Sequence, residues 1–89
     1  MKRYLIRADY EATETNQNFA GEQRTYYYGK DYKSTEGATH INSLARYWGY
    51  TTKASAASGL RAHQSLAESE TKRGNWNVSC ELVEVDIAE

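Results

Sequence analysis

Residues 4–12, which read Tyr-Leu-Ile-Arg-Ala-Asp-Tyr-Glu-Ala, carry the pattern from which the rest of the fold can be predicted. Apolar or aromatic side chains occupy every second position: Tyr4, Ile6, Ala8, Tyr10 and Ala12. The positions between them are charged, apart from Leu5. A period of two indicates a half-buried β-strand, because successive side chains of a strand point to opposite faces of its sheet. We therefore expect a first strand here.

Two further strands are expected. Residues 23–28 end in three consecutive tyrosines before Gly29, a composition that favours a strand followed by a turn. In the last segment the apolar residues fall on even positions from Trp76 to Leu82 and on odd positions from Val83 to Ile87. A strand with such a phase change must twist strongly, form a bulge or be covered on both faces. We expect a bulge near Leu82.

Two helices are expected between the second and third strands. The first covers residues 41–48, with Thr39 as its N-cap and Gly49 as its end. The second begins after Thr51 or Thr52, reaches about residue 70 and is ended by Gly74. Its predicted inner face consists of Ala54, Ala57, Leu60, Gln64 and Ala67. Gly59 within this helix indicates close approach by a neighbouring side chain.

The order β-β-α-α-β predicts an α+β fold in which residues 1–89 form a single domain. We expect a three-stranded antiparallel sheet with the first strand in the centre and both helices packed on one face. A sheet with two free edges can pair with another chain, so we expect a partner complex or a homodimer.

Composition argues against several functional classes. The 89 residues contain 11 Lys and Arg against 12 Asp and Glu, a net charge of −1 that favours neither nucleic acid nor a membrane surface. No apolar run approaches the length of about 18 residues that a membrane span needs. Residues 1–7 lack the apolar core of a signal peptide, so we expect a cytoplasmic protein.

Few residues could support catalysis. Cys80 is the only cysteine and is in phase with apolar neighbours, so we expect it to be a small buried side chain; His40 and His63 are expected at the surface or its boundary. Phosphate-binding glycine loops and common hydrolase motifs are missing from the sequence. The acidic residues Glu81, Glu84, Asp86 and Glu89 fall on both faces of the last strand, which indicates a solvated edge. We expect no enzymatic activity, no cofactor and no metal.

The unusual feature is the aromatic content: eight tyrosines and two tryptophans against one phenylalanine. From Arg24 to Arg61 the chain also carries six basic residues against two acidic ones, a local net charge of +4. Aromatic rings and arginines dominate binding hot spots. The predicted partner-binding residues are Tyr26, Tyr28, Tyr32, Arg46, Tyr47 and Tyr50. Contacts to phosphates or to an acidic partner are expected from Arg24, Lys30, Lys33 and Lys53.

The lack of proline, the tyrosine-rich middle and the segment from Trp76 to Val85 (WNVSCELVEV) resemble small proteins of phages and mobile elements, some of which are anti-CRISPR proteins. The resemblance implies a stoichiometric inhibitor that occupies a surface of a host-defence nucleoprotein complex. The residues themselves predict a non-enzymatic protein-binding module. The alternative is a small nucleic-acid-binding domain that stacks bases on its tyrosines and holds phosphates with its lysines and arginines. A small-ligand sensor or an enzyme subunit is a third alternative.

Overall fold

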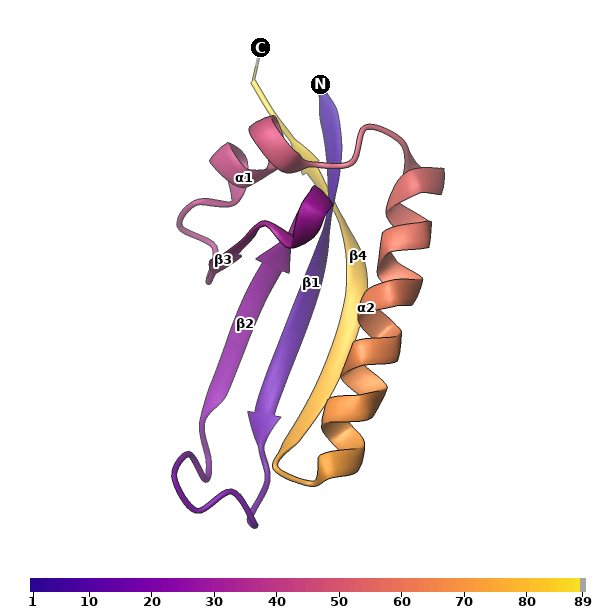
Figure 1. Ribbon diagram of the computed structural model, residues 1–89. Coiled ribbons are helices and arrows are strands. Elements are labelled where there is room, and N and C mark those ends of the chain that lie inside the picture. Colours follow the sequence, from indigo (N-terminus) through magenta and orange to yellow (C-terminus); the bar gives the residue numbers. More distant parts are fainter. Residues whose placement is uncertain (89) are drawn as a thin grey trace.

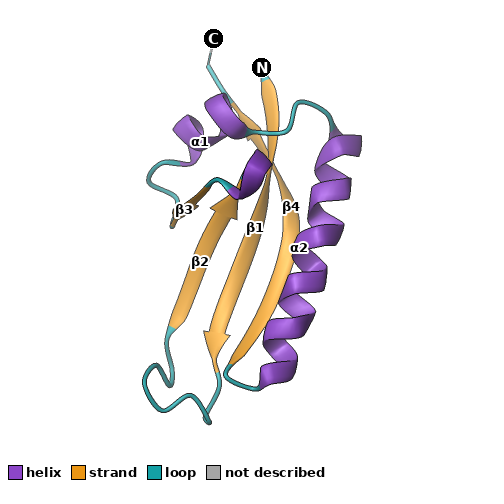
Figure 2. Ribbon diagram, viewed as in Figure 1, coloured by secondary structure: helices purple, strands orange, loops and turns teal. Residues whose placement is uncertain are grey.

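The computed structural model describes residues 1–88, which form one antiparallel sheet and two α-helices (Figures 1 and 2). The strands lie in the order β3-β2-β1-β4. In chain order the elements are β1 (Lys2–Ala12), β2 (Gln23–Tyr28), a 3-10 turn (Lys30–Tyr32), β3 (Ser34–Glu36), α1 (Ile41–Trp48), α2 (Lys53–Arg73) and β4 (Trp76–Asp86). The α+β class is as predicted, but the sheet has four strands rather than three. The fourth, β3, arises where the chain turns back after Tyr28 and pairs with the end of β2.

β1 lies between β2 and β4, as the sequence predicted. Its pairing with β4 runs without interruption from Lys2↔Asp86 to Ala12↔Trp76. The expected bulge near Leu82 is therefore wrong. The phase change in β4 instead matches a change in which face of the strand is covered: Leu82 lies on the same face as Ile6, whereas Val83 and Val85 lie on the face of Leu5.

The two helices pack on opposite faces of the sheet, which corrects the prediction that both share one face. On one face, α1 contributes Leu44 and Ala45 to a core with Leu5, Val85 and Ile87. On the other face, α2 lies over Ile6 and Cys80: the site of a Cβ on Gly59 adjoins Ile6, and the Cys80 thiol donates to the His63 carbonyl. The order of the elements alone did not reveal the second packed face; its local sign is Leu5, an apolar residue at a position of β1 that alternation assigns to the charged face.

The chain passes from one face to the other between the two helices, at Tyr50. The backbone of Tyr50 forms two hydrogen bonds with Tyr4, each 2.9 Å long. Tyr4 already pairs with β4 on one side, so Tyr50 occupies the position that β2 would reach if it were longer. This single bridge takes the chain past the end of β2 from the α1 face to the α2 face.

The ends of α2 match the sequence signals. The Thr52 hydroxyl accepts a hydrogen bond from the Ser55 amide, and Gly74 ends the helix in the left-handed conformation. The buried face consists of Ala56, His63 and Ala67, so the predicted positions Ala54 and Gln64 are instead exposed. α1 has the predicted bounds, although His40 rather than Thr39 is its N-cap. Within residues 1–88, neither helix combines the length and the apolar character needed to cross a membrane.

Candidate functional site

Seven aromatic side chains form a continuous series of ring contacts on the α2 face of the sheet. Six of them are Phe, Tyr or Trp, and the seventh is a histidine. We call this series the aromatic row. Its centroid distances are 5.9 Å for Phe19–Trp76, 6.0 Å for Trp76–Tyr10, 5.4 Å for Tyr10–Tyr26, 6.4 Å for Tyr26–Tyr28, 4.6 Å for Tyr28–His63 and 5.1 Å for His63–Tyr32. The row thus joins the loop after β1, three strands, α2 and the 3-10 turn.

Strand alternation and the path of α2 together place the tyrosines of β2 on one face of the sheet, beside the helix. Tyr26 and Tyr28 share a face because they are two residues apart, and register puts Tyr26 opposite the small Ala8 of β1. Figure 1 shows α2 running alongside β4, on the side of the sheet away from β2. The helix packs on β4 and β1, so the rings that rise from β2 form a wall facing it.

A groove of about 310 Å³ lies between this wall and the helix. We call it the aromatic groove. It is lined by Tyr10, Arg24, Tyr26, Tyr28, Glu70 and Trp76. Tyr10 packs edge-on against both Tyr26 and Trp76, with interplanar angles of 82° in each case. The groove is therefore a series of ring edges and faces rather than a flat stack.

Burial and charge set the properties of the groove's polar groups. Burial, together with the neighbouring Tyr28, raises the pKa of Tyr10 far above its usual value. The Arg24 guanidinium donates to the Glu22 carboxylate at 2.9 Å. The guanidinium also lies 4.9 Å from the Phe19 ring centroid and 5.6 Å from that of Trp76. Arg24 thus fixes the far end of the groove.

The other end of the aromatic row is marked by backbone strain. Asp31 and Tyr32 both adopt positive φ, 56° and 57°, a conformation that costs energy for residues other than glycine. Tyr32 is 61% exposed although its ring contacts His63. Tyr50 lies nearby, and burial, Tyr32 and Asp31 raise its pKa. The turn therefore presents an aromatic ring to solvent at a cost in backbone energy.

The structure brings together only some of the predicted binding residues. Tyr26, Tyr28 and Tyr32 belong to the aromatic row, Arg24 borders it and Tyr50 lies beside Tyr32. Arg46 and Tyr47 are on α1, which covers the opposite face of the sheet. Arg46 donates to the Ala88 carbonyl at 2.8 Å, and Tyr47 is 71% exposed. These two residues therefore cannot share one contact surface with the row.

The predicted basic contacts are also dispersed. The Lys33 ammonium lies 4.9 Å from the ring centroid of Trp48 on α1. Lys30 is exposed in the 3-10 turn, and Lys53 is exposed at the start of α2. Of the predicted cations, Arg24 is the one that lines the aromatic groove.

Four members of the row were not predicted as site residues: Tyr10, Phe19, His63 and Trp76. The sequence pattern could have indicated Tyr10 and Trp76, since both are in phase with the apolar positions of their strands. His63 was expected near the surface, but it is buried against Tyr28 because the inner face of α2 is rotated from the predicted one. Phe19 lies in a loop whose path has no periodic signal.

Cys80 and His63 are close, but their geometry is not that of a thiol and its general base. The thiol donates to the His63 backbone carbonyl at 3.8 Å rather than to the imidazole. Burial raises the pKa of Cys80, with a smaller contribution from Asp9, and burial lowers the pKa of His63. Both shifts favour the neutral forms, whereas a thiolate–imidazolium pair requires the reverse.

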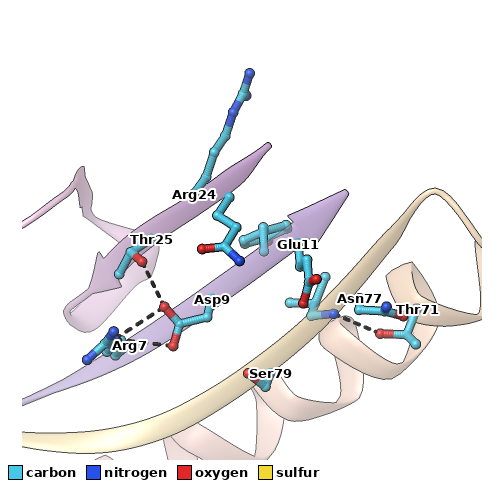
Figure 3. Close-up of a pocket in the computed structure, with 11 residues that line it drawn as sticks. Arg7, Asp9, Glu11, Arg24, Thr25, Thr71, Asn77 and Ser79 are labelled. Atoms are coloured by element: carbon cyan, nitrogen blue, oxygen red, sulfur yellow. Dashed lines mark hydrogen bonds and ion pairs between the residues drawn. The ribbon is translucent and has the colours of Figure 1, made fainter. Parts of the chain in front are cut away.

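A second pocket, of about 360 Å³, lies on the opposite, polar face of the sheet (Figure 3). Asp9 accepts hydrogen bonds there from Thr25 at 2.7 Å and from Arg7 at 3.3 Å. In Figure 3 the Arg24 side chain points away from this pocket, toward the other face. Arg7, Asp9 and Thr25 thus form one small polar network in this pocket.

The acidic residues of β4 are paired with cations of β1 or with the N-terminal amine that precedes it. Glu81 lies 3.8 Å from Arg7, Glu84 is 3.8 Å from Lys2, and Asp86 is 3.8 Å from the N-terminal amine. Glu89 lies outside the described residues. Among residues 1–88, acidic, histidine and cysteine side chains form no group of three that could hold a metal ion.

No protein-family model, curated protein sequence or solved structure matches this chain. Its function must therefore be argued from the geometry of its surface.

Proposed function

We propose that this protein is a non-enzymatic protein-binding module, and that the aromatic row with its groove is the contact surface. The observation that carries the proposal is the continuous contact of seven rings beside α2, of which only His63 is buried and the other six are at least partly exposed. Tyrosine and tryptophan bury large areas at low entropic cost and keep a polar group for hydrogen bonding. The strained backbone at Tyr32 also supports the assignment of this surface as the contact site, because strained residues concentrate at functional sites.

The charges around the row favour a protein over a nucleic acid. Arg24 is neutralised by Glu22, and the helix side of the groove carries Glu70. Lys33 is directed to Trp48, a residue of α1 on the other face. A nucleic-acid site would need several cations along the rings to contact successive phosphates. The nucleic-acid alternative is therefore the less supported of the two.

The proposal includes that the protein has no enzymatic activity. The neutral forms that burial favours at Cys80 and His63 support it, because neither group is then activated as a nucleophile or base. The resemblance to phage-encoded inhibitors gives the proposal a more specific form: a protein of the cytoplasm that blocks a surface of a host-defence nucleoprotein complex.

Two exposed tyrosines provide a matched test. Tyr32 belongs to the row and is 61% exposed, whereas Tyr47 is 71% exposed on the opposite face. Replacing either by alanine removes an exposed ring, so both variants should fold. Tagged wild-type, Tyr32→Ala and Tyr47→Ala proteins are used to capture partners from nuclease-treated lysate of the cells that encode the chain. Recovery of one stoichiometric protein by wild type and Tyr47→Ala, with reduced recovery by Tyr32→Ala, is the expected result. Equal recovery by all three, or loss of every partner on nuclease treatment, would contradict the proposal.

A further inference from the structure

We infer that the outer edge of β4 pairs with the same edge of a second copy of this chain, in an antiparallel register centred on Val83. The two four-stranded sheets then join into one continuous sheet. β4 is the end strand of its sheet, so no strand lies on its outer side among residues 1–88. The inference concerns self-association and does not depend on the aromatic row.

The ladder shows which residues of β4 direct their backbone groups outward. In an antiparallel ladder, every second residue directs both its N–H and its C=O to the same neighbouring strand. Tyr4 bonds through both groups to Tyr50, on the side away from β4, so the backbone of its register partner Glu84 is directed away from β1. Every second residue of β4 from Glu84 therefore faces outward. Val78 agrees, because its N–H donates to the Thr71 hydroxyl of α2 at 3.1 Å.

These outward groups form a row that another strand can extend. Thr71 occupies the outward N–H of Val78, so the open part of the row begins after it. We call this part the free edge; it consists of Cys80, Leu82, Glu84 and Asp86. Alternating donors and acceptors of this kind are a template for an extended segment.

β4 lacks the features that commonly keep an edge strand from pairing. It is 11 residues long, pairs with β1 without interruption and contains neither lysine nor proline. Its acidic side chains could still repel another copy. However, each has a cation 3.8 Å away: Arg7 for Glu81, Lys2 for Glu84 and the N-terminal amine for Asp86. These cations reduce the repulsion between two such edges.

The free edge is complementary to itself. An antiparallel strand pair is two-fold symmetric, so the same edge of two copies can form both sides of it. A register centred on Val83 places Leu82 opposite Glu84 of the second copy. Cys80 then lies opposite Asp86 of the second copy, so the whole free edge is engaged.

The same register suits the side chains on the α1 face. Val83 lies opposite Val83 of the second copy, and Glu81 lies opposite Val85. Val83 already packs against the core around Leu5, so this contact joins the two cores. No acidic residue of β4 lies opposite another acidic residue of β4, whereas like charges directly opposite would destabilise the pair.

Helix α2 leaves the centre of this register open. There it lies over β1, because Gly59 adjoins Ile6. It bonds to the outer side of β4 at Val78, well away from Val83. The residue of the second copy that would lie opposite Val78 comes after Asp86, where β4 has ended.

The first test compares the unaltered full chain at micromolar and millimolar concentrations. Sedimentation equilibrium should show the mass rising from that of one chain to that of two. Amide exchange followed by NMR should slow at least about tenfold at Leu82 and Glu84, because their N–H groups gain partners in the dimer. The amides of Val83 and Val85 face β1 and are the internal control, so their rates should change far less.

Two variants at one position separate backbone pairing from charge. Glu84→Pro removes the outward N–H, and proline is tolerated in an edge strand where the N–H faces solvent. Glu84→Ala removes the carboxylate and keeps the N–H. We expect Glu84→Pro to stay monomeric at millimolar concentration and Glu84→Ala to dimerise. Tyr32→Ala, which alters the aromatic row, should also dimerise.

A mass of one chain at millimolar concentration would overturn the inference, as would a dimer in which the Leu82 and Glu84 amides gain no protection. Equal dimerisation of Glu84→Pro and Glu84→Ala, or a dimer lost in Tyr32→Ala, would also overturn it by placing the contact elsewhere. The exchange comparison uses the unaltered chain, so it decides even if Glu84→Pro fails to fold. If no dimer forms while partner capture still depends on Tyr32, the proposed function stands and the edge pairing is wrong.

Discussion

Leu5 and Ile6 are adjacent in β1, and both are fully buried on opposite faces of the sheet. Leu5 packs with Leu44 of α1, whereas Ile6 lies beneath Gly59 of α2. This pair of neighbours explains how a chain of 89 residues builds a core: one strand is covered on both sides at the end where the helices meet. Farther along β1 only the α2 face is covered, and the aromatic row lies on that same face, beside the helix.

Truncating either residue should destabilise the protein, but through different helices. Leu5→Ala and Ile6→Ala should each lower the free energy of unfolding by about 2–5 kcal/mol, because each leaves a cavity in a packed core. Leu5→Ala should speed amide exchange chiefly in α1, and Ile6→Ala chiefly in α2. Urea denaturation and hydrogen exchange measure both effects. Identical exchange patterns in the two variants would show that the two faces are not separate cores.

Gly59→Ala should destabilise the protein although alanine is the better helix former by about 1 kcal/mol. A Cβ at this position would collide with the ring and hydroxyl of Tyr50, which crosses between the faces. Tyr50→Phe in the same chain should recover part of the loss by removing the hydroxyl. Ser58→Ala, at the adjacent exposed position, is the control and should change the melting temperature little. A stabilised Gly59→Ala protein would show that Tyr50 does not pack there.

Stability should fall as the solution is acidified through the titration range of histidine. Burial lowers the pKa of His63 in the folded protein below its usual value of 6.5, so the unfolded chain binds the proton more readily. The contribution is complete above about pH 6.5 and decreases as the pH falls toward the folded-state pKa. His63→Gln should flatten the fall in unfolding free energy between about pH 7 and pH 5. Equal slopes in wild type and His63→Gln would refute the assignment.

The loop between β1 and β2 should depend on Asn16. This residue is buried, donates to the Asn75 carbonyl at 3.1 Å and accepts from the Phe19 amide at 3.2 Å. Asn16→Ala leaves both backbone groups without this partner and should cost about 1–3 kcal/mol of unfolding free energy. It should also loosen the contact of Phe19 with Trp76, which indole fluorescence can report. Asn18→Ala, at an exposed position, should change the free energy of unfolding little. An equally small change for Asn16→Ala would mean that other contacts hold the loop.

Local signals in the sequence predicted most of the elements. Alternation located β1, and the glycines and Thr52 located the helix ends. Local patterns did not predict that the second face is covered, because this depends on the bridge between Tyr50 and Tyr4, two residues that are 46 positions apart in the chain. The phase change at Val83 and the apolar Leu5 were the two local signs of it.

The candidate site was predicted in part for the same reason. Composition identified the tyrosines of β2, and alternation placed Tyr26 and Tyr28 on one face. Whether Tyr47 joins them depends on which face α1 covers, which local pattern does not specify. His63 was misplaced because an alanine-rich helix has several faces of nearly equal apolar character, and packing against the sheet selected one of them.

The central claim is that the aromatic groove, and not the rest of the surface, binds the partner. Isothermal titration of the captured partner with Tyr26→Ala and Tyr47→Ala proteins tests it most directly, after circular dichroism has shown that both variants are folded. Tyr26→Ala should weaken binding by more than about 1 kcal/mol, at least fivefold in Kd, while Tyr47→Ala leaves the affinity unchanged. Unchanged affinity for Tyr26→Ala, or a greater loss for Tyr47→Ala, would place the contact surface on the other face and contradict the account.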